Sequence, residues 1–399
     1  MTALKDLLTQ VADEARLYDG TDRAVRAMRR RRTAARLAPV AAALLVMVVV
    51  VSALALSRGS EPGPSPVAAG LPTLLSPAHA PPELPSDRGV GPASLAYLRR
   101  ANIEDDGKLR LVTTGGRHYA LPWALRVVGI SPDGRWVLWA ESQWVVLRDL
   151  TGTERHEFPA AGGWVSAVWS PDGRRLVVQF VHEPVPELID QPGRDTVMVD
   201  LRPLAQRTVP LTDNHDFPCA LRNSGLIVLC PRAESSSTNL RLVDGGTGRT
   251  TGEIDVHAWM RPGEGIGSIA GPLVLRPDDT TLLLPLLGPP APTTDQSDLV
   301  AIDIDGGRVT ARYPLPDRLA PSVSKAPDGS ESHGESDRRE LAAAPADGVL
   351  LVHISPRAND RMSGRVVAIE MVAPETGALT VVTRVSGDIA RIFLPGGNY

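Results

Sequence analysis

The sequence predicts an all-β protein: a six-bladed, alternatively seven-bladed, β-propeller preceded by a cytosolic helix and one transmembrane helix. Three observations lead to this prediction. A turn-forming tetrapeptide is repeated, short β-rich stretches alternate with polar turns along most of the chain, and a long uncharged apolar run lies near the N-terminus.

The repeated tetrapeptide is Ser-Pro-Asp-Gly, and its two copies start 39 residues apart. The copies are Ser131, Pro132, Asp133 and Gly134, and then Ser170, Pro171, Asp172 and Gly173. In this motif Ser opens a hairpin turn, Pro presets φ, Asp tolerates the third position, and Gly accepts the left-handed conformation. A period near forty residues with one such turn per unit is typical of four-stranded propeller blades.

Weaker copies of the turn extend the pattern to five units, at residues 222–225, 276–279 and 345–348. Each unit reads as strand, tight turn, strand, loop, strand, turn, strand. The β-rich stretches 94–100 and 109–112 precede the first full unit, and 388–394 follows the last. We expect these to form one blade shared between the termini, because closure removes free sheet edges. That gives six blades; a seventh would need a unit hidden in an insertion.

The segments around the two close copies, residues 131–138 and 169–177, resemble the WD-repeat-like propeller repeats of bacterial envelope proteins, including the Tol-system propeller. The resemblance covers roughly residues 94–399, but the Trp-Asp dipeptide that ends eukaryotic repeats is missing. It implies a propeller fold and a tendency toward binding roles. It implies no specific activity, because propellers host many functions.

The run 37–57 contains no charged residue and is long enough to cross the hydrocarbon core of a bilayer. Seven arginines lie just before it, whereas no Lys or Arg lies between Arg58 and Arg88. The positive-inside rule therefore predicts a single-pass protein of the cell membrane with a cytoplasmic N-terminus and an extracytoplasmic propeller. The alternative is a cleaved signal peptide, with small-x-small sites at 53–55 and 78–80.

These features divide the chain into four parts: residues 1–36, a cytosolic amphipathic and basic helical segment; 37–57, the span; 58–93, a Pro-rich linker; and 94–399, the propeller. Within the first part Leu4, Leu7, Leu8, Val11 and Ala15 form an apolar stripe at helical spacing. Such a stripe requires a cytosolic protein partner or the inner leaflet. The layout is similar to that of membrane regulators of extracytoplasmic-function sigma factors.

The net charge of −4 is unevenly distributed: residues 1–58 carry +5, so the remainder carries −9. An acidic ectodomain argues against nucleic acid and leaves an extracytoplasmic protein, peptide or glycan as the expected partner. The basic residues are almost all Arg, and Ala, Gly and Pro are abundant. This usage is typical of a high-GC actinobacterium.

The two cysteines, Cys219 and Cys230, flank the third turn in the extracytoplasmic part. A two-residue turn at 224–225 would place them opposite each other, within bridging distance. If Gly225 instead forms a bulge, as in the Ser-Pro-Asp-Gly copies, the cysteines would point to opposite faces. We favour the disulfide, because an oxidising compartment permits it.

No catalytic signature is present in the sequence: it contains neither His-Glu-x-x-His, nor Gly-x-Ser-x-Gly, nor a Walker lysine. No catalytic residue, metal site or cofactor is therefore expected. Six of the seven tryptophans lie between residues 123 and 169. They could form an aromatic platform, but their alternation along strands favours core packing.

Loop length is the remaining functional signal. The second-to-third-strand and unit-to-unit connections are long and share one face of the disc, whereas the other face carries short turns. Binding usually resides on elaborated loops. The longest connection in the second unit carries an acidic group that could take a cationic ligand or a metal: His182, Glu183, Glu187, Asp190 and Asp195.

Together these features predict a membrane-tethered extracytoplasmic propeller that is a non-catalytic binding or sensing module. Two alternatives stay open. One is an envelope enzyme, such as a propeller hydrolase or lyase with its site in the central channel. The other is a regulator of a sigma factor acting through residues 1–36.

Overall fold

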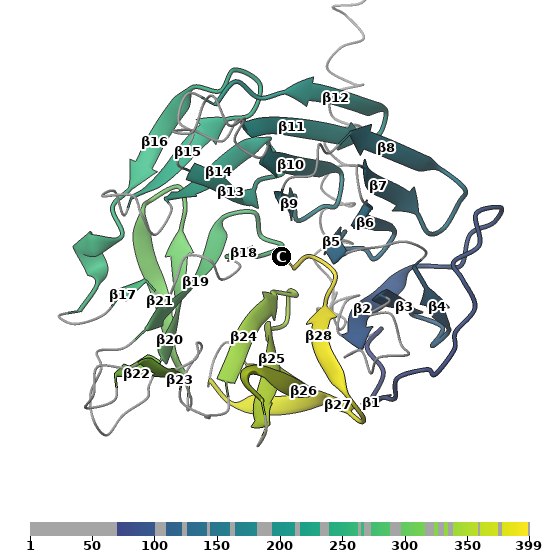
Figure 1. The fold of residues 1–399 in the computed structure, drawn as a ribbon. Helices are drawn as coiled ribbons and strands as arrows, with labels where there is room; N and C mark the ends of the chain where they lie inside the picture. Colours follow the sequence, from purple (N-terminus) through teal and green to yellow (C-terminus); the bar gives the residue numbers. More distant parts are fainter. Residues whose placement is uncertain are drawn as a thin grey trace, which may run out of the picture. The chain divides into compact units, whose positions relative to one another are not determined.

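A computed structural model describes the following residues of the chain: 70–99, 109–121, 126–141, 144–159, 164–181, 194–211, 216–231, 239–261, 265–266, 273–287, 297–315, 323–325, 331–333, 338–357, 360–373 and 377–397. All of them belong to the compact unit Pro64–Tyr399. Six β-sheets follow one another around a central axis as the blades of a propeller (Figure 1). Among the described residues no helix is long and apolar enough to cross a membrane, and the run 37–57 lies outside them.

The blades are numbered in chain order, with strands named from the axis outward. Blade 1 contains β28 (Ile389–Phe393), β2 (Ala93–Arg99), β3 (Leu109–Thr113) and β4 (His118–Ala120). Blade 2 contains β5 (Arg126–Ile130), β6 (Trp136–Glu141), β7 (Trp144–Asp149) and β8 (Arg155–Pro159). Blade 3 contains β9 (Trp164–Trp169), β10 (Arg175–Val181), β11 (Arg194–Leu201) and β12 (Leu204–Thr208).

The second half of the ring follows the same plan. Blade 4 contains β13 (Asp216–Leu221), β14 (Leu226–Pro231), β15 (Leu240–Asp244) and β16 (Thr250–Ile254). Blade 5 contains β17 (Gly265–Ile266) and β18 (Val274–Leu275), both paired with β19 (Thr281–Leu287), then β20 (Ser297–Asp303) and β21 (Arg308–Leu315). Blade 6 contains β24 (Arg338–Ala343), β25 (Val349–Arg357), β26 (Asp360–Val372), β27 (Leu379–Val385) and β1 (Leu74–Leu75).

Two small elements lie outside the blades. A 3-10 helix, η1 (His257–Trp259), follows blade 4. The hairpin of β22 (Val323–Lys325) and β23 (Glu331–His333) lies in the connection between blades 5 and 6.

Blade 1 closes the ring by combining strands from both ends of the propeller. The C-terminal strand β28 pairs antiparallel with β2, so that Ala96 lies opposite Phe393. The expected shared blade is therefore present, and the propeller has six blades.

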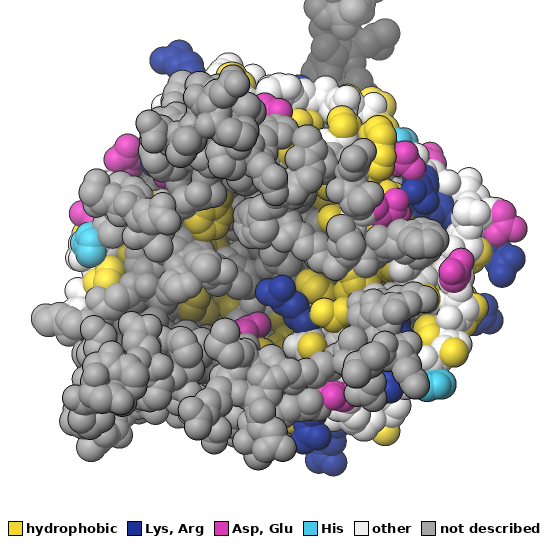
Figure 2. Space-filling view, in the orientation of Figure 1, with side chains coloured by type: hydrophobic (Ala, Val, Ile, Leu, Met, Phe, Trp, Pro, Cys, Tyr) yellow, Lys and Arg dark blue, Asp and Glu magenta, His cyan; other side chains and the backbone are white. Residues whose placement is uncertain are grey.

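The blades are held together by apolar side chains on both faces of their sheets. Among the described residues, six apolar clusters lie one between each pair of neighbouring blades, with blade 6 counted next to blade 1. Trp139 on β6, for example, faces blade 1, whereas Leu138 faces blade 3. Charged side chains of both signs lie around the outer edge (Figure 2).

The two Ser-Pro-Asp-Gly segments fold as predicted, into turns joining the first two strands of blades 2 and 3. In blade 2 the Ser131 hydroxyl donates to Asp133 Oδ1 at 2.6 Å and accepts from Trp136 N at 2.8 Å. The equivalent bonds of Ser170 measure 2.7 and 2.9 Å. Gly134 has φ of +68° and makes a close approach, because its carbonyl accepts a hydrogen bond from Ala93 N in blade 1.

Residues 70–92, called the strap below, lie against the outside of three blades, although their composition predicts a spacer. Strand β1 adds a parallel fifth strand to blade 6, Leu84 N and Pro82 O bond with Ala120 on blade 1, and Val90 N donates to Leu150 O of blade 2. The buried Arg148 guanidinium donates to the carbonyls of Pro85 and Arg88. Residues 70–92 are thus part of the packing of the propeller.

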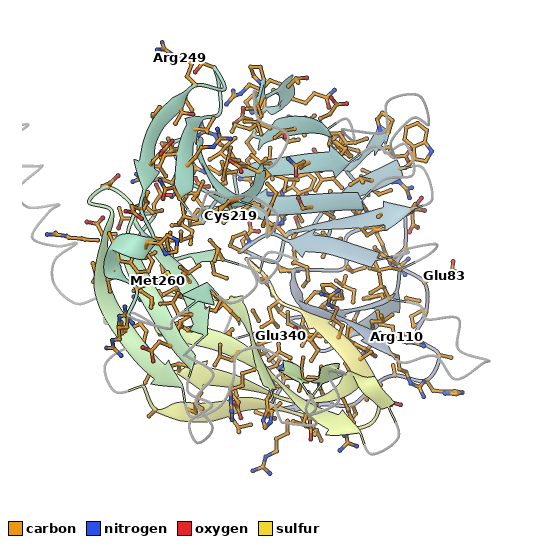
Figure 3. All side chains as sticks on the ribbon, turned by 60° about the vertical axis from the view of Figure 1, so that its left-hand side comes forward. Glu83, Arg110, Cys219, Arg249, Met260 and Glu340 are labelled. Atoms are coloured by element: carbon orange, nitrogen blue, oxygen red, sulfur yellow. A yellow bond between two sulfur atoms is a disulfide. The ribbon has the colours of Figure 1, made fainter. Side chains whose placement is uncertain are left out.

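A disulfide joins Cys219 and Cys230, with 5.8 Å between their Cα atoms (Figure 3 labels Cys219). Gly225 takes a left-handed φ of +92°, as in the Ser-Pro-Asp-Gly turns, and this turn alone would point the two cysteines to opposite faces of the sheet. A β-bulge at Cys219 shifts the register again, so that Cys230 lies opposite Phe217. The extra residue of a bulge re-aims its side chain, and this restores the bridging geometry.

Candidate functional site

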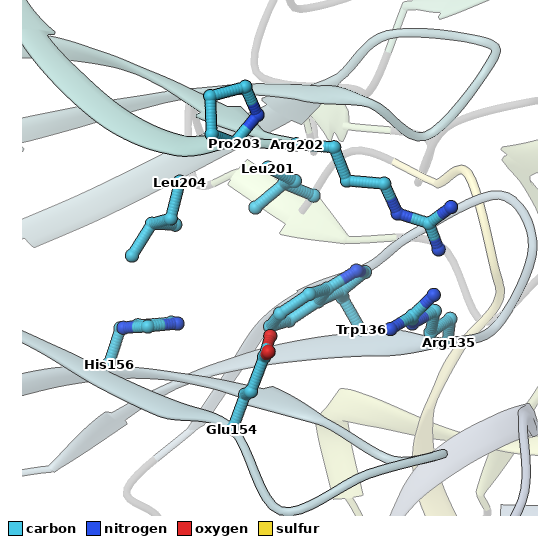
Figure 4. Close-up of a pocket in the computed structure, with 8 residues that line it drawn as sticks. All are labelled: Arg135, Trp136, Glu154, His156, Leu201, Arg202, Pro203 and Leu204. Carbon is cyan, nitrogen blue, oxygen red and sulfur yellow. The ribbon is translucent and has the colours of Figure 1, made fainter.

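A pocket of about 350 Å³ lies between blades 2 and 3, on the face that carries the short turns. Blade 2 contributes the start of β6 and the start of β8, and blade 3 contributes the tight turn between β11 and β12. The pocket is lined by Arg135, Trp136, Glu154, His156, Leu201, Arg202, Pro203 and Leu204 (Figure 4).

The floor of the pocket is the indole of Trp136, which is 3% exposed. The first turn of the repeat fixes its backbone, because Ser131 N donates to Trp136 O at 2.9 Å. The guanidinium carbon of Arg135 lies 5.7 Å from the centre of the indole, and the His156 ring lies 6.2 Å away at an angle of 31°. The aromatic floor is therefore held between two polar side chains.

Arg135 is held in place by an ion pair with Asp149 at the end of β7. Its Nε and Nη2 groups donate to Asp149 Oδ2 at 3.0 and 2.5 Å. The hydrogen bond to Asp149 raises the pKa of Arg135 above its ordinary value. Burial alone would raise the pKa of Asp149, but its hydrogen bonds with Arg135 and Thr151 outweigh burial and hold the pKa below its ordinary value. Both groups therefore stay charged at neutral pH.

The opposite wall is the two-residue turn of blade 3, in which Leu201 pairs with Leu204. Leu201 is buried, whereas Leu204 is 44% exposed at the mouth of the pocket. Between them lie Arg202 and Pro203, joined by a cis peptide bond. Within the described part of the chain, no residue forms an ion pair or hydrogen bond with the side chain of Arg202.

The pocket has two chemically different ends. The guanidinium groups of Arg135 and Arg202 lie at one end, on opposite walls, whereas His156 and Leu204 lie at the other (Figure 4). Glu154 stands beside the indole, and its backbone carbonyl accepts hydrogen bonds from Asp149 N and Arg148 Nη1. Such a pocket can hold a small ligand with an anionic group at one end and an apolar body.

A second charged cluster is internal to blade 6. Arg339 Nε donates to Glu370 Oε2 at 2.6 Å, and His353 Nδ1 lies 3.2 Å from Glu370 Oε1. Arg339 and Glu370 are both buried. The cluster connects the three strands β24, β25 and β26 of blade 6.

The acidic group predicted as a binding site falls almost entirely outside the described residues. Only Asp195 is described; it lies on β11 opposite Phe180 and is exposed. His182, Glu183, Glu187 and Asp190 lie outside. In the described part of the chain, no group of three or more His, Cys, Asp and Glu side chains is arranged to hold a metal ion.

The pocket between blades 2 and 3 was not predicted. Its residues come from three segments that are distant in sequence, and it lies on the face with short turns, whereas loop length predicts binding on the opposite face. The one sequence signal is the pair Arg135-Trp136 directly after the best-matched turn. The partner segment, Arg202-Pro203, follows a strand end without any repeated motif.

No protein-family model matches the chain, and no curated protein matches it. Among solved structures it is similar to a putative TolB from Agrobacterium tumefaciens, with 13% identity, coverage of 78% of this chain and 97% of that chain, and a TM-score of 0.41. Oligogalacturonate lyase from Vibrio parahaemolyticus shares 12% identity over 75% of this chain and 80% of that chain, with a TM-score of 0.43. For puromycin hydrolase the identity is 12%, the coverage 77% and 55%, and the TM-score 0.38. This likeness concerns the fold, which the strand pairing already defines.

Proposed function

We propose that the chain is a single-span membrane protein whose propeller lies outside the cytoplasm and is a non-catalytic binding or sensing module. The observation that carries the proposal is the pocket between blades 2 and 3, where the aromatic floor and Arg135 are fixed in advance by neighbouring side chains. Fixed side chains favour binding, because little conformational entropy is lost when the ligand arrives.

The electrostatics of the pocket support binding rather than proton transfer. The raised pKa of Arg135 and the lowered pKa of Asp149 keep both groups charged over the whole neutral range. A general acid or base works best with a pKa near the operating pH. A permanently charged pair instead holds a ligand group in place.

Two observations support the location outside the cytoplasm. The uncharged run 37–57 with its arginine flank has the pattern of a membrane span with a cytoplasmic N-terminus. The disulfide between Cys219 and Cys230 fits an oxidising compartment, since disulfides are rare in the cytosol.

The proposal is tested by photocrosslinking in intact cells. A photoreactive amino acid replaces Leu204 at the mouth of the pocket, and a matched control replaces Val381, which is 47% exposed on the outer strand β27 of blade 6. We expect a crosslinked partner from position 204 that is absent from position 381. Identical products at both positions, or none at either, would contradict a binding role for the pocket.

A further inference from the structure

We propose that the pocket between blades 2 and 3 binds the free C-terminal end of a peptide whose last side chain is apolar, an inference that rests on the binding function proposed above. The volume of the pocket, about 350 Å³, is near the lower limit of the range of ~300–1,000 Å³ that is usual for small-molecule sites. A volume of this size accepts one or two terminal residues rather than a folded surface.

The carboxylate lies at the arginine end of the pocket. Asp149 engages Nε and Nη2 of Arg135, and no hydrogen bond to the described residues uses its Nη1 group. Arg202 faces it from the opposite wall (Figure 4), and none of the residues that the structure describes bonds to its guanidinium. Planar guanidinium groups are well matched to carboxylate oxygens.

The charge balance favours a carboxylate over a more highly charged anion. Asp149 neutralises Arg135, so Arg202 supplies the net positive charge at this end. The carboxylate of Glu154 stands beside the indole rather than at this end (Figure 4), and its charge disfavours a ligand with a second negative charge. One carboxylate matches one uncompensated guanidinium, whereas a phosphate dianion does not.

The rest of the pocket suits a peptide chain. Leu201, Pro203 and Leu204 form an apolar wall opposite the Trp136 ring, which leaves a slot for one apolar side chain. The carboxylate of Glu154 is an acceptor for the N–H of the last peptide bond. An anionic end, an apolar side chain and an amide donor together define the C-terminal residue of a peptide.

The test uses the purified full-length chain and two tripeptide probes, N-acetyl-Ala-Ala-Leu with a free carboxylate and the same peptide with a C-terminal amide. Binding is measured by isothermal titration calorimetry. We expect the amide to bind about tenfold more weakly or worse, because it removes the charge that the arginines recognise.

The deciding variant is Arg202→Gln, with Arg249→Gln as the matched control. Arg249 lies at the end of the turn between β15 and β16 of blade 4, which corresponds to the turn between β11 and β12 that holds Arg202. Its side chain points away from the sheets (Figure 3). Arg202→Gln is expected to weaken binding of the acid probe about tenfold and to leave binding of the amide unchanged. Arg249→Gln is expected to change neither. Both residues are exposed, so the thermal midpoint should not move in either variant.

The binding function and the ligand class can be overturned separately. If position 204 crosslinks a partner in cells but the acid and amide probes bind equally or not at all, the C-terminal ligand class is wrong and the binding function stands. An acid preference that survives Arg202→Gln also overturns the assignment. If position 204 yields no partner and no probe binds, both proposals are wrong.

Discussion

At the scale of single residues, Gly134 lies where the backbones of two blades meet. A Cβ atom at this position would lie 2.2 Å from the carbonyl oxygen of Ala93. Gly307, in the last turn of blade 5, has a similar positive φ of +61° but has nothing within 4 Å of the same atom. Replacing Gly307 therefore measures the free-energy cost of the left-handed conformation alone. Replacing Gly134 adds the cost of a clash between two blades.

We expect Gly307→Ala to lower the free energy of unfolding by about 1 kcal/mol, the cost of placing Ala in this conformation. Gly134→Ala should cost about 3 kcal/mol or more, because the backbone of blade 1 must also shift. Urea denaturation of the two variants measures the difference. Equal losses would mean that the blades do not approach each other at this turn.

The pair of Arg135 and Asp149 should contribute to stability in a pH-dependent way. Because the pKa of Asp149 is lower in the folded state, the contribution is full above the ordinary carboxyl value of about 3.9 and is lost as the pH falls through the folded value. Asp149→Asn should lower the free energy of unfolding at pH 7 by about 2 kcal/mol. It should also flatten the loss of stability below pH ~4, as measured by urea denaturation at several pH values. An unchanged acid slope would be evidence against the ion pair.

At the scale of elements, the strap is the part of the propeller that composition describes least well. Its Pro, Ser and Gly residues predict an extended spacer, whereas residues 70–92 bond to three blades. Composition does not reveal that this backbone hydrogen-bonds to the blades through its main-chain groups. Leu74 pairs with Arg384, and Val90 N donates to Leu150 O. Such bonds leave no side-chain pattern in the sequence.

The strap should detach more readily in mild acid. Ala78 N donates to the Tyr97 hydroxyl, which lies 3.1 Å from His118 Nδ1. Burial, with a smaller effect from Arg110, lowers the pKa of His118. A lowered folded-state pKa means that stability is full above the ordinary histidine value of about 6.5 and declines as the pH falls below it.

We therefore expect the protection factor of the Ala78 amide, which is its exchange rate corrected for the intrinsic pH effect, to fall as the pH drops below ~6.5, because protonation of His118 weakens the packing of the buried ring beside the Tyr97 hydroxyl, and this extra pH dependence comes from His118. His118→Gln should remove this extra dependence. A variant that keeps the dependence of the wild type would show that another group controls the strap.

The repeat motifs were predictable, whereas the candidate site was not. The Ser131 and Ser170 turns follow from local chemistry, because each residue type is required by its own turn position. The pocket depends instead on how blade 3 packs against blade 2, which brings Arg202 close to Trp136 although 66 residues separate them. Such contacts between blades arise from tertiary packing, and the residue pattern of one strand does not predict them.

At the scale of the whole molecule, the disulfide connects the two inner strands of blade 4. The cysteines are separated by 11 residues, and closing so short a loop stabilises a protein by about 2–3 kcal/mol in the chain-entropy description. Replacing both Cys219 and Cys230 with Ser should lower the free energy of unfolding by that amount, as measured by guanidinium denaturation. No change on replacement, or on addition of a reductant to the wild type, would contradict this role.

We propose that the propeller lies outside the cytoplasm, and the redox state of Cys219 and Cys230 in living cells is the measurement that decides it. Cells are treated with a membrane-permeant alkylating reagent before lysis, and the purified chain is then reduced and alkylated with a second, heavier reagent. We expect Cys219 and Cys230 to carry only the second label, because a disulfide protects them from the first reagent in the cell. The first label on both cysteines would contradict it.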